Sequence, residues 1–162
     1  MTKVTLLVHP FFSLSKNERR DISASGRKIL NRYRRGIDAV KDGRVIVYSA
    51  SYKSQEISPI ERELHAWVRE KIQVDNILIV EAALGWKVEE EMAGEFLKKR
   101  MPAAEEIRGL EVFAFGEYKT GCVAMYAAQF ERRYELRRPV TVLGKYSFTP
   151  EAISHMKALD EE

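Results

Sequence analysis

The stretch ILIVEAALGWKVEEEMAGEFLKKRMP, from Ile77 to Pro102, decides the fold class of this chain of 162 residues. It begins with a continuous apolar run, Ile77–Glu81, which is typical of a strand buried on both faces of a parallel sheet. Apolar residues then recur at Val88, Met92 and Phe96, the spacing of one helix face, and the pattern stops around Pro102. A buried strand followed by an amphipathic helix is the repeating unit of α/β proteins.

The same unit recurs on both sides of this stretch. Ser58–Glu61 combines a capping box with a proline at the first helical position, which is a strong helix start. Thr149–Glu151 opens a short last helix. Further strands are predicted at Val4–Val8, Val45–Ser49, Val112–Phe115 and Val140–Leu143, and further helix faces span Ile22–Val40, Ile60–Ile72 and Val123–Tyr134.

Strand and helix therefore alternate five times, at intervals of roughly 30 to 40 residues. This alternation predicts one α/β domain over residues 1–162, a three-layer sandwich of the Rossmann-like or flavodoxin-like kind. Its five-stranded sheet is expected to be mostly parallel. The order of the strands does not follow from the sequence.

Composition indicates a globular protein, with 45% hydrophobic and 31% charged residues. No apolar run approaches the ~18 residues of a membrane span, and the start MTKVTLLVHPFF is too short in apolar residues for a secretory segment. The chain has one cysteine, which fits a reducing cytoplasm. Abundant Arg, Lys and Glu with few Asn and Gln are typical of thermophile proteins. We therefore expect a cytoplasmic protein without a membrane partner.

Ligands of open α/β sheets bind at the carboxyl ends of the strands, so the loops after the predicted strands are the candidate site. Four of these loops carry an aromatic residue directly beside a lysine. Such pairs suit an anionic, partly planar small molecule, or single-stranded nucleic acid. The alternative is that each loop has an aromatic lid and a solubilising lysine. The pairs are Tyr52-Lys53, Trp86-Lys87, Tyr118-Lys119 and Lys145-Tyr146.

Known phosphate and metal motifs do not occur. The first strand is followed by HPFFSLSKN, which has no glycine, and neither a dinucleotide fingerprint nor a P-loop is found. The histidines His9, His65 and His155 lack ligand-like spacing, so neither a metal nor a cofactor is expected. His65 is predicted to lie in a helix at the surface or its boundary.

Three titratable residues lie at the ends of predicted strands. His9 follows the first strand and could act as a base, or could be neutral and bonded to a loop carbonyl. Glu81 ends a strand that is otherwise apolar, and Glu117 follows another. A buried glutamate could be a general base, but a structural ion pair is the more ordinary interpretation.

The lone cysteine, Cys122, has two interpretations. If Thr120 caps the next helix, the thiol lies in its first turn beside Lys119, where the helix dipole favours the thiolate. However, Cys122 recurs every four residues with Tyr126 and Phe130, a stripe that faces the sheet. Free cysteine is among the most buried residue types, so core packing is the ordinary interpretation.

The segments FAFGEYKTGCVAMYAAQF and RPVTVLGKYSFTPEAISHMKAL together resemble the C-terminal part of isochorismatase-like cysteine hydrolases. In that family a strand enters a turn with glycine and threonine, and a cysteine-valine pair opens an alanine-containing helix. The resemblance implies that Cys122 is the nucleophile and that a lysine lies near the end of the third strand, for which Lys87 is the nearest candidate. The aspartate that the family has at the end of the first strand has no counterpart, since His9 and Pro10 lie there.

Two functions are therefore expected as alternatives. The first is a small-molecule protein, most concretely a hydrolase in which thiolate Cys122 attacks a carbonyl, the Gly121 and Cys122 amides bind the oxyanion, and His9 or Lys87 moves the proton. Glu81 is a further catalytic candidate.

The second is a nucleic-acid-binding or assembly module. It rests on the segment Lys16–Arg44, with ten basic and four acidic residues. Arg132, Arg133, Arg137 and Arg138 add to it. A homo-oligomer has only the general frequency of α/β oligomers in its favour.

Overall fold

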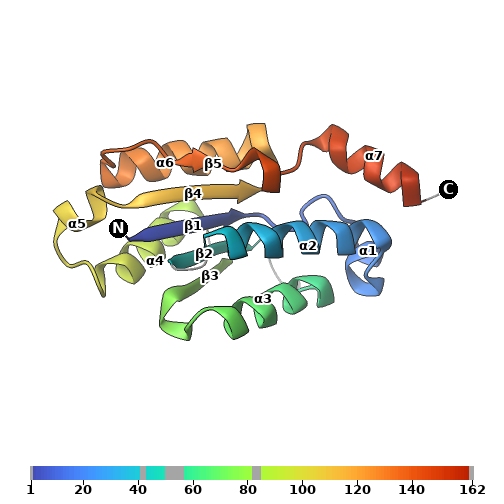
Figure 1. The fold of residues 1–162 in the computed structure, drawn as a ribbon, viewed down its shortest axis with the longest axis horizontal. Coiled ribbons are helices and arrows are strands. Elements are labelled where there is room, and N and C mark those ends of the chain that lie inside the picture. The colour runs from blue at the N-terminus through green and yellow to red at the C-terminus, as the bar shows by residue number, and fades with distance from the viewer. Residues whose placement is uncertain (1, 41–42, 50–56, 82–84, 161–162) are drawn as a thin grey trace.

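The computed structural model describes residues 2–40, 43–49, 57–81 and 85–160. Its centre is a five-stranded parallel sheet in the order β3-β2-β1-β4-β5 (Figure 1). The predicted fold class, a three-layer α/β sandwich of the Rossmann-like or flavodoxin-like kind, is confirmed. The strands are β1 (Lys3–Val8), β2 (Arg44–Ser49), β3 (Ile77–Glu81), β4 (Glu111–Gly116) and β5 (Thr141–Val142).

The helices cover both faces of this sheet. Most of them begin and end within about two residues of the predicted spans, and a proline at the first or second helical position opens α3 as expected. The helices are α1 (Lys16–Asp21), α2 (Ala24–Ala39), α3 (Pro59–Lys71), α4 (Trp86–Lys98), α5 (Ala104–Arg108), α6 (Ala124–Tyr134) and α7 (Pro150–Asp160), and the short helical turns are η1 (Val74–Asn76), η3 (Lys119–Val123) and η4 (Gly144–Tyr146).

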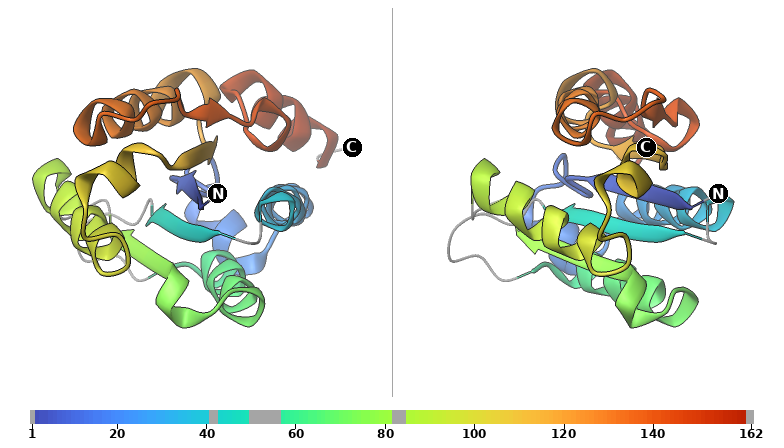
Figure 2. Two further views of the ribbon diagram at one scale, coloured as in Figure 1. Left: turned by 60° about the vertical axis from the view of Figure 1, so that its left-hand side comes forward. Right: turned by 90° about the vertical axis from the view of Figure 1, so that its left-hand side faces the viewer.

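Helices lie on both faces of the sheet (Figure 2), and each face has an apolar core of its own. Helices α4, α5 and α6 pack on one face, and α2, α3 and α7 pack on the other. Alternate residues of β1 serve the two cores, because Leu6 and Val8 face the first and Leu7 faces the second. A strand that is apolar on both faces reads as the continuous run seen in the sequence.

The predicted helix Ile22–Val40 corresponds to α2, and α1 before it is an additional short helix. Ser15 caps α1 with a complete capping box, and Ser23 caps α2, so two helix starts occur within nine residues. Ile22 between them adopts a left-handed conformation that ends α1. The start of α1 was not predicted, because this helix has no buried residues and therefore no apolar stripe in the sequence.

The strand order places β1 between β2 and β4, and the chain reverses direction across the sheet at this point. A crevice at the carboxyl ends of the strands on either side of such a switch is where open α/β sheets bind ligands. None of the helices among the described residues is both long and apolar enough to cross a membrane.

Candidate functional site

The loops after β1 and β4 meet at the switch point and are tied together by Glu117. Its carboxylate accepts hydrogen bonds from the backbone N–H of Phe11 at 2.6 Å, from that of Ser13 at 3.0 Å and from the hydroxyl of Tyr33. Glu117 is fully buried, and burial raises the pKa of its carboxyl, while the bonds from Ser13, Tyr33 and Phe11 oppose that rise. Every partner lies inside the protein, so Glu117 holds the loops in place and forms no ion pair among the described residues.

The backbone beneath Glu117 leaves no room for a side chain. Gly116 has a φ of 138°, and a Cβ at this position would lie 2.1 Å from the carbonyl oxygen of Val8. Across the crevice, His9 and Phe11 have φ values of 46° and 67°, in the left-handed region that non-glycine residues seldom adopt. Such conformations persist where surrounding bonds hold them, and they are concentrated at functional sites.

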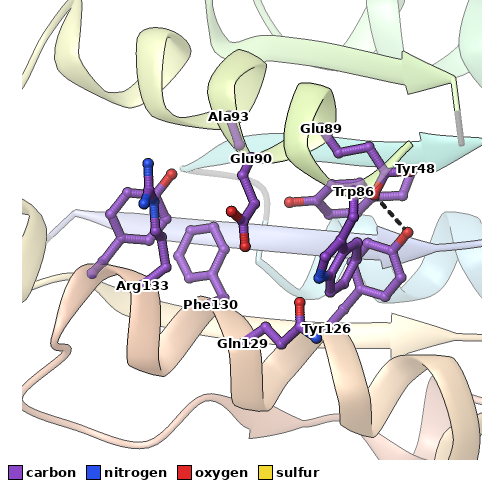
Figure 3. A pocket seen from close by; sticks show the side chains of 10 residues that line it. Tyr48, Trp86, Glu89, Glu90, Ala93, Tyr126, Gln129, Phe130 and Arg133 are labelled. Carbon is purple, nitrogen blue, oxygen red and sulfur yellow. Dashed lines mark hydrogen bonds between the residues drawn. The ribbon is translucent and has the colours of Figure 1, made fainter. Parts of the chain in front are cut away.

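A second hydrogen-bonded chain runs through the same edge and ends at His9. The hydroxyl of Tyr126 donates to Glu89 Oε2 at 2.8 Å, and it lies 3.2 Å from Nε2 of His9 (Figure 3 shows the Tyr126–Glu89 bond). Because the Tyr126 proton is used on Glu89, Tyr126 must accept the proton on His9 Nε2. The lone pair of a neutral His9 is then on Nδ1, at the end of the chain.

The pKa shifts in this chain favour a neutral histidine. Burial lowers the pKa of His9, and the nearby carboxylate of Glu61 opposes the shift in part. Burial also raises the pKa of Glu89, against the hydrogen bond from Tyr126. At neutral pH, His9 is therefore an unprotonated imidazole that could accept a proton.

Aromatic rings surround this chain. The Tyr126 ring lies 4.5 Å from the rings of both Tyr48 and Trp86, and the ring of Phe12 lies 6.3 Å from that of His9 (Figure 3 shows the first three of these residues). Phe12 in turn packs edge-on against Tyr118 at 5.8 Å. Phe12 is 38% exposed, so this aromatic cluster reaches the surface beside His9.

A separate polar cluster lies at the end of β2. Glu61 Oε2 accepts a hydrogen bond from the Ser49 hydroxyl at 2.5 Å and lies 3.3 Å from Nε2 of His65. His65 is 3% exposed, so its predicted surface position is wrong; the helix turns it toward Glu61, one turn earlier. The carboxylate lies between serine and histidine, so this is not a serine–histidine pair of the kind that activates a nucleophile.

Cys122 is half-buried and packs with Trp86 against the core of the α4–α6 face. The predicted cap is wrong, because η3 is a π-helical turn without a side-chain cap and Gly121 within it is non-helical. Burial raises the pKa of the Cys122 thiol, which is opposite to the expected thiolate. The N–H of Gly121, predicted to bind an oxyanion, instead donates to the carbonyl of Tyr118 at 3.0 Å.

The other predicted site residues are divided among three places. Trp86 is half-buried beside Tyr126, and Lys87 is exposed at the start of α4. Glu81 ends β3, where its backbone pairs with Ser49. The side chain of Glu81, and the pair Tyr52-Lys53, lie outside the described residues.

The pair Lys145-Tyr146 does not lie beside His9. β5 ends level with Ala114, and η4 then turns toward α2, where Tyr146 packs on Phe115 with ring centroids 6.0 Å apart. Lys119 extends the same way, since a Cβ at Gly144 would lie 2.9 Å from its Nζ. These residues border a different part of the surface from Trp86 and Lys87.

The sequence reasoning missed the central residues of the chain, Glu89 and Tyr126. Tyr126 was predicted to face the core, and its ring does pack there. Its hydroxyl, however, lies beside His9 at the carboxyl edge of the sheet. The spacing of Glu89 could have indicated its burial, because it lies four residues before Ala93 and seven before Phe96, and both of these are buried on the same helix face. Val88, predicted to face the core, is 38% exposed.

A small cavity of about 30 Å³ lies between α4 and α6, next to the hydrogen-bonded pair Glu89 and Tyr126 (Figure 3). This volume holds one or two water molecules and is far smaller than a ligand pocket. Two buried polar atoms that line it, Gln129 Oε1 and the Tyr134 hydroxyl, have no hydrogen-bond partner among the described residues. No group of three His, Cys, Asp or Glu side chains suited to a metal ion occurs in the described part of the chain.

Comparison of the chain with protein-family models, with curated proteins and with solved structures found no match. The resemblance to isochorismatase-like hydrolases therefore stays a prediction.

Proposed function

We propose that the protein is an enzyme that binds a small, partly planar ligand at the carboxyl edge of β1 and moves a proton with His9. The observation that carries the proposal is the hydrogen-bonded chain from Glu89 through Tyr126 to His9. A histidine at the switch point of the sheet that is oriented by a hydrogen-bonded tyrosine and carboxylate is suited to general acid–base catalysis.

In this proposal, Nδ1 of His9 takes a proton from the ligand. The charge that then develops on the imidazole is stabilised through Nε2–H and Tyr126 by the carboxylate of Glu89. Glu61, whose carboxylate already opposes the lowering of the His9 pKa, adds to this stabilisation. Because the pKa of His9 stays lowered, the imidazolium gives its proton up again readily, which suits a group that alternates between two protonation states.

The surroundings of His9 also indicate how a ligand would be oriented. Two carboxylates lie near His9. Glu61 acts on it electrostatically, and Glu89 is joined to it through Tyr126. Both would repel a negative group of a ligand. The exposed ammonium of Lys87 follows Trp86 at the outer side. The planar part of an anionic ligand therefore fits beside His9 and Phe12, with its negative group directed outward to Lys87.

A more specific candidate is the isochorismatase-like cysteine hydrolase, with Cys122 as nucleophile. It is favoured by one observation: Cys122 precedes Tyr126 by four residues and is close enough to affect the pKa of its hydroxyl, so it adjoins the His9 chain. Iodoacetamide reacts with the single thiolate, and the alkylation rate across pH reports its pKa. We expect a midpoint above about 8.5, because the thiol is partly buried. A midpoint well below that value would favour the cysteine mechanism over proton transfer by His9 alone.

The proposal is tested by NMR titration of the histidine side chains. We expect a pKa for His9 below about 6.5, with the Nε2–H tautomer, whereas exposed His155 serves as the internal reference. Addition of benzoate or adenosine monophosphate at millimolar concentration should shift the resonances of His9 and the Trp86 indole. A normal His9 pKa, or shifts confined to other surfaces, would contradict the proposal.

A further inference from the structure

A second surface, on the opposite face of the sheet from the His9 chain, has the character of a binding groove. It lies between the second half of α2 and the turn η4 and has a volume of about 520 Å³. Its walls carry three cations, one carboxylate and one aromatic ring: Arg32, Arg35, Asp38, Lys145 and Tyr146, with Ala39. We name it the α2–η4 groove.

Within the part of the chain that the structure describes, the cations of the groove are not used in ion pairs. Arg32, Arg35 and Lys145 form no salt bridge with a carboxylate of the described residues. Lys28 continues the row, because residues 28, 32 and 35 share one helix face and span about 10 Å along α2. Unpaired cations on two neighbouring elements create a positive potential that attracts an anion.

Aromatic rings lie among these cations. The guanidinium of Arg32 is 4.2 Å from the centre of the Phe148 ring, which fixes its plane, and the ammonium of Lys145 lies 5.7 Å from the ring of Tyr146. Tyr146 is half-buried and held against Phe115, so one part of its ring is fixed and another part borders the groove. A fixed aromatic ring between cations can stack with a base while the cations contact the backbone phosphates.

We propose that single-stranded nucleic acid binds along the α2–η4 groove. A row of cations about 10 Å long exceeds the reach of a single phosphate and suits a chain of them. A single strand also has free base faces to stack on Tyr146, whereas the bases of a duplex are already stacked on each other. No base-edge readout is part of this binding, so it is independent of sequence and strongly dependent on salt.

This groove deepens the earlier alternative, in which the whole segment Lys16–Arg44 was the nucleic-acid surface. Much of the positive charge of that segment lies elsewhere. Arg20 pairs with Asp21, Arg34 pairs with Glu63, and Arg19 donates to the carbonyl of Phe12. In the α2–η4 groove, two arginines of that segment, Arg32 and Arg35, lie beside a lysine and an aromatic ring from the distant turn η4.

The test is fluorescence anisotropy of a labelled oligouridine of about 15 nucleotides, with the full chain at about 50 mM and about 200 mM salt. Three phosphate contacts on a single strand predict a loss of affinity of about 18-fold over this range. The double variant Arg35→Glu/Lys145→Glu should weaken binding at least about tenfold at the lower salt and should flatten the salt dependence. Lys98→Glu, an exposed reversal on α4, is the matched control and should change affinity less than about twofold.

Several results would overturn the proposal. One is the absence of binding at the lower salt concentration, and another is equal weakening by Lys98→Glu. A duplex of the same length that binds as tightly as the single strand would refute stacking on Tyr146. Uridine monophosphate that competes as well as the oligonucleotide would refute a multi-phosphate site. Thermal melting of each variant separates loss of binding from loss of folding, and none of these results depends on the function proposed for His9.

Discussion

Glu117 and Glu89 are two buried carboxylates at the same edge of the sheet, and they differ in what they hold. Glu117 accepts from two backbone amides and the Tyr33 hydroxyl, so its network begins and ends inside the protein. Glu89 accepts from Tyr126, whose oxygen contacts His9, and His9 is only half-buried. Burial raises the pKa of both carboxyls. A closed network can only stabilise the fold, whereas an open one ends on a group that a ligand can reach.

The largest effect is expected from a substitution in the backbone next to Glu117, which would disrupt its closed network. Gly116→Ala would place a Cβ 2.1 Å from the Val8 carbonyl oxygen at a φ of 138°, so the strand end must shift. We expect a loss of about 4 kcal/mol in the free energy of unfolding, or failure to fold, because strain and overpacking add. Urea unfolding measures it.

Gly85→Ala is the matched control for this crowding. Gly85 also has a positive φ, of 87°, but a Cβ there would meet nothing within 4 Å. A cost of about 1 kcal/mol is expected from the backbone conformation alone. Equal costs for the two variants would show that the crevice does not restrict the backbone at Gly116.

The second effect compares the carboxylates directly. Glu117→Gln would turn one acceptor into an amide donor that faces backbone N–H groups, at a cost of about 3 kcal/mol in unfolding free energy. Glu89→Gln keeps an acceptor for its single donor, Tyr126, and should cost about 1 kcal/mol or less. If the Glu89 variant is as destabilised as the Glu117 variant, the distinction between closed and open networks is wrong.

The third effect uses the two tyrosines. Tyr126→Phe removes the oxygen that accepts from Nε2–H of His9. That hydrogen bond stabilises the charged imidazole more than the neutral one, so without it the pKa of His9 should fall further. Tyr33→Phe removes a donor to Glu117 and should cost about 1 to 2 kcal/mol while leaving the pKa of His9 as it is. NMR titration and urea unfolding of both variants check the pair. A His9 pKa that moves equally in both would contradict two separate networks.

The smallest effect is on pH dependence. His9 has a lowered pKa in the folded protein, so its neutral form is favoured by folding. Its contribution to stability is complete above the unfolded value of about 6.5 and is lost as the pH falls through the folded pKa. The raised pKa of Glu89 and Glu117 acts in the opposite direction, since their contribution is lost as the pH rises above about 4.5 through the folded pKa.

The variant His9→Gln isolates the contribution of His9 to the pH dependence of stability. Relative to His9→Gln, the wild type should lose stability as the pH is lowered from about 7 to about 5. Urea unfolding at both pH values measures the difference. A wild type that gains stability relative to the variant on acidification would show that His9 is charged in the folded protein.

The fold was predictable because its signal is local. A strand such as β3 that is covered on both faces reads as an unbroken apolar run, and the helix that follows shows one apolar stripe. The edge that holds His9 followed from the same pattern, since all parallel strands end there.

The side-chain partners at that edge were not predictable, because they depend on register between distant elements. Tyr126 and Glu89 lie on different helices, and their hydroxyl and carboxylate meet only once α4 and α6 pack on the same face. Lys145-Tyr146 lies toward α2 rather than beside His9, because the chain turns into η4 directly after β5. The length of β5 is set by contact with β4, not by the apolar run itself.

Glu117 lies 106 residues beyond Phe11, the amide it holds. During synthesis β1 leaves the ribosome early, but its edge loop lacks this partner until most of the chain has been made. The left-handed conformation of Phe11 can therefore be held by Glu117 only once β4 has been made and has paired with β1. A nascent chain that stalls before Glu117 would carry a nearly complete N-terminal half with an unformed His9 loop.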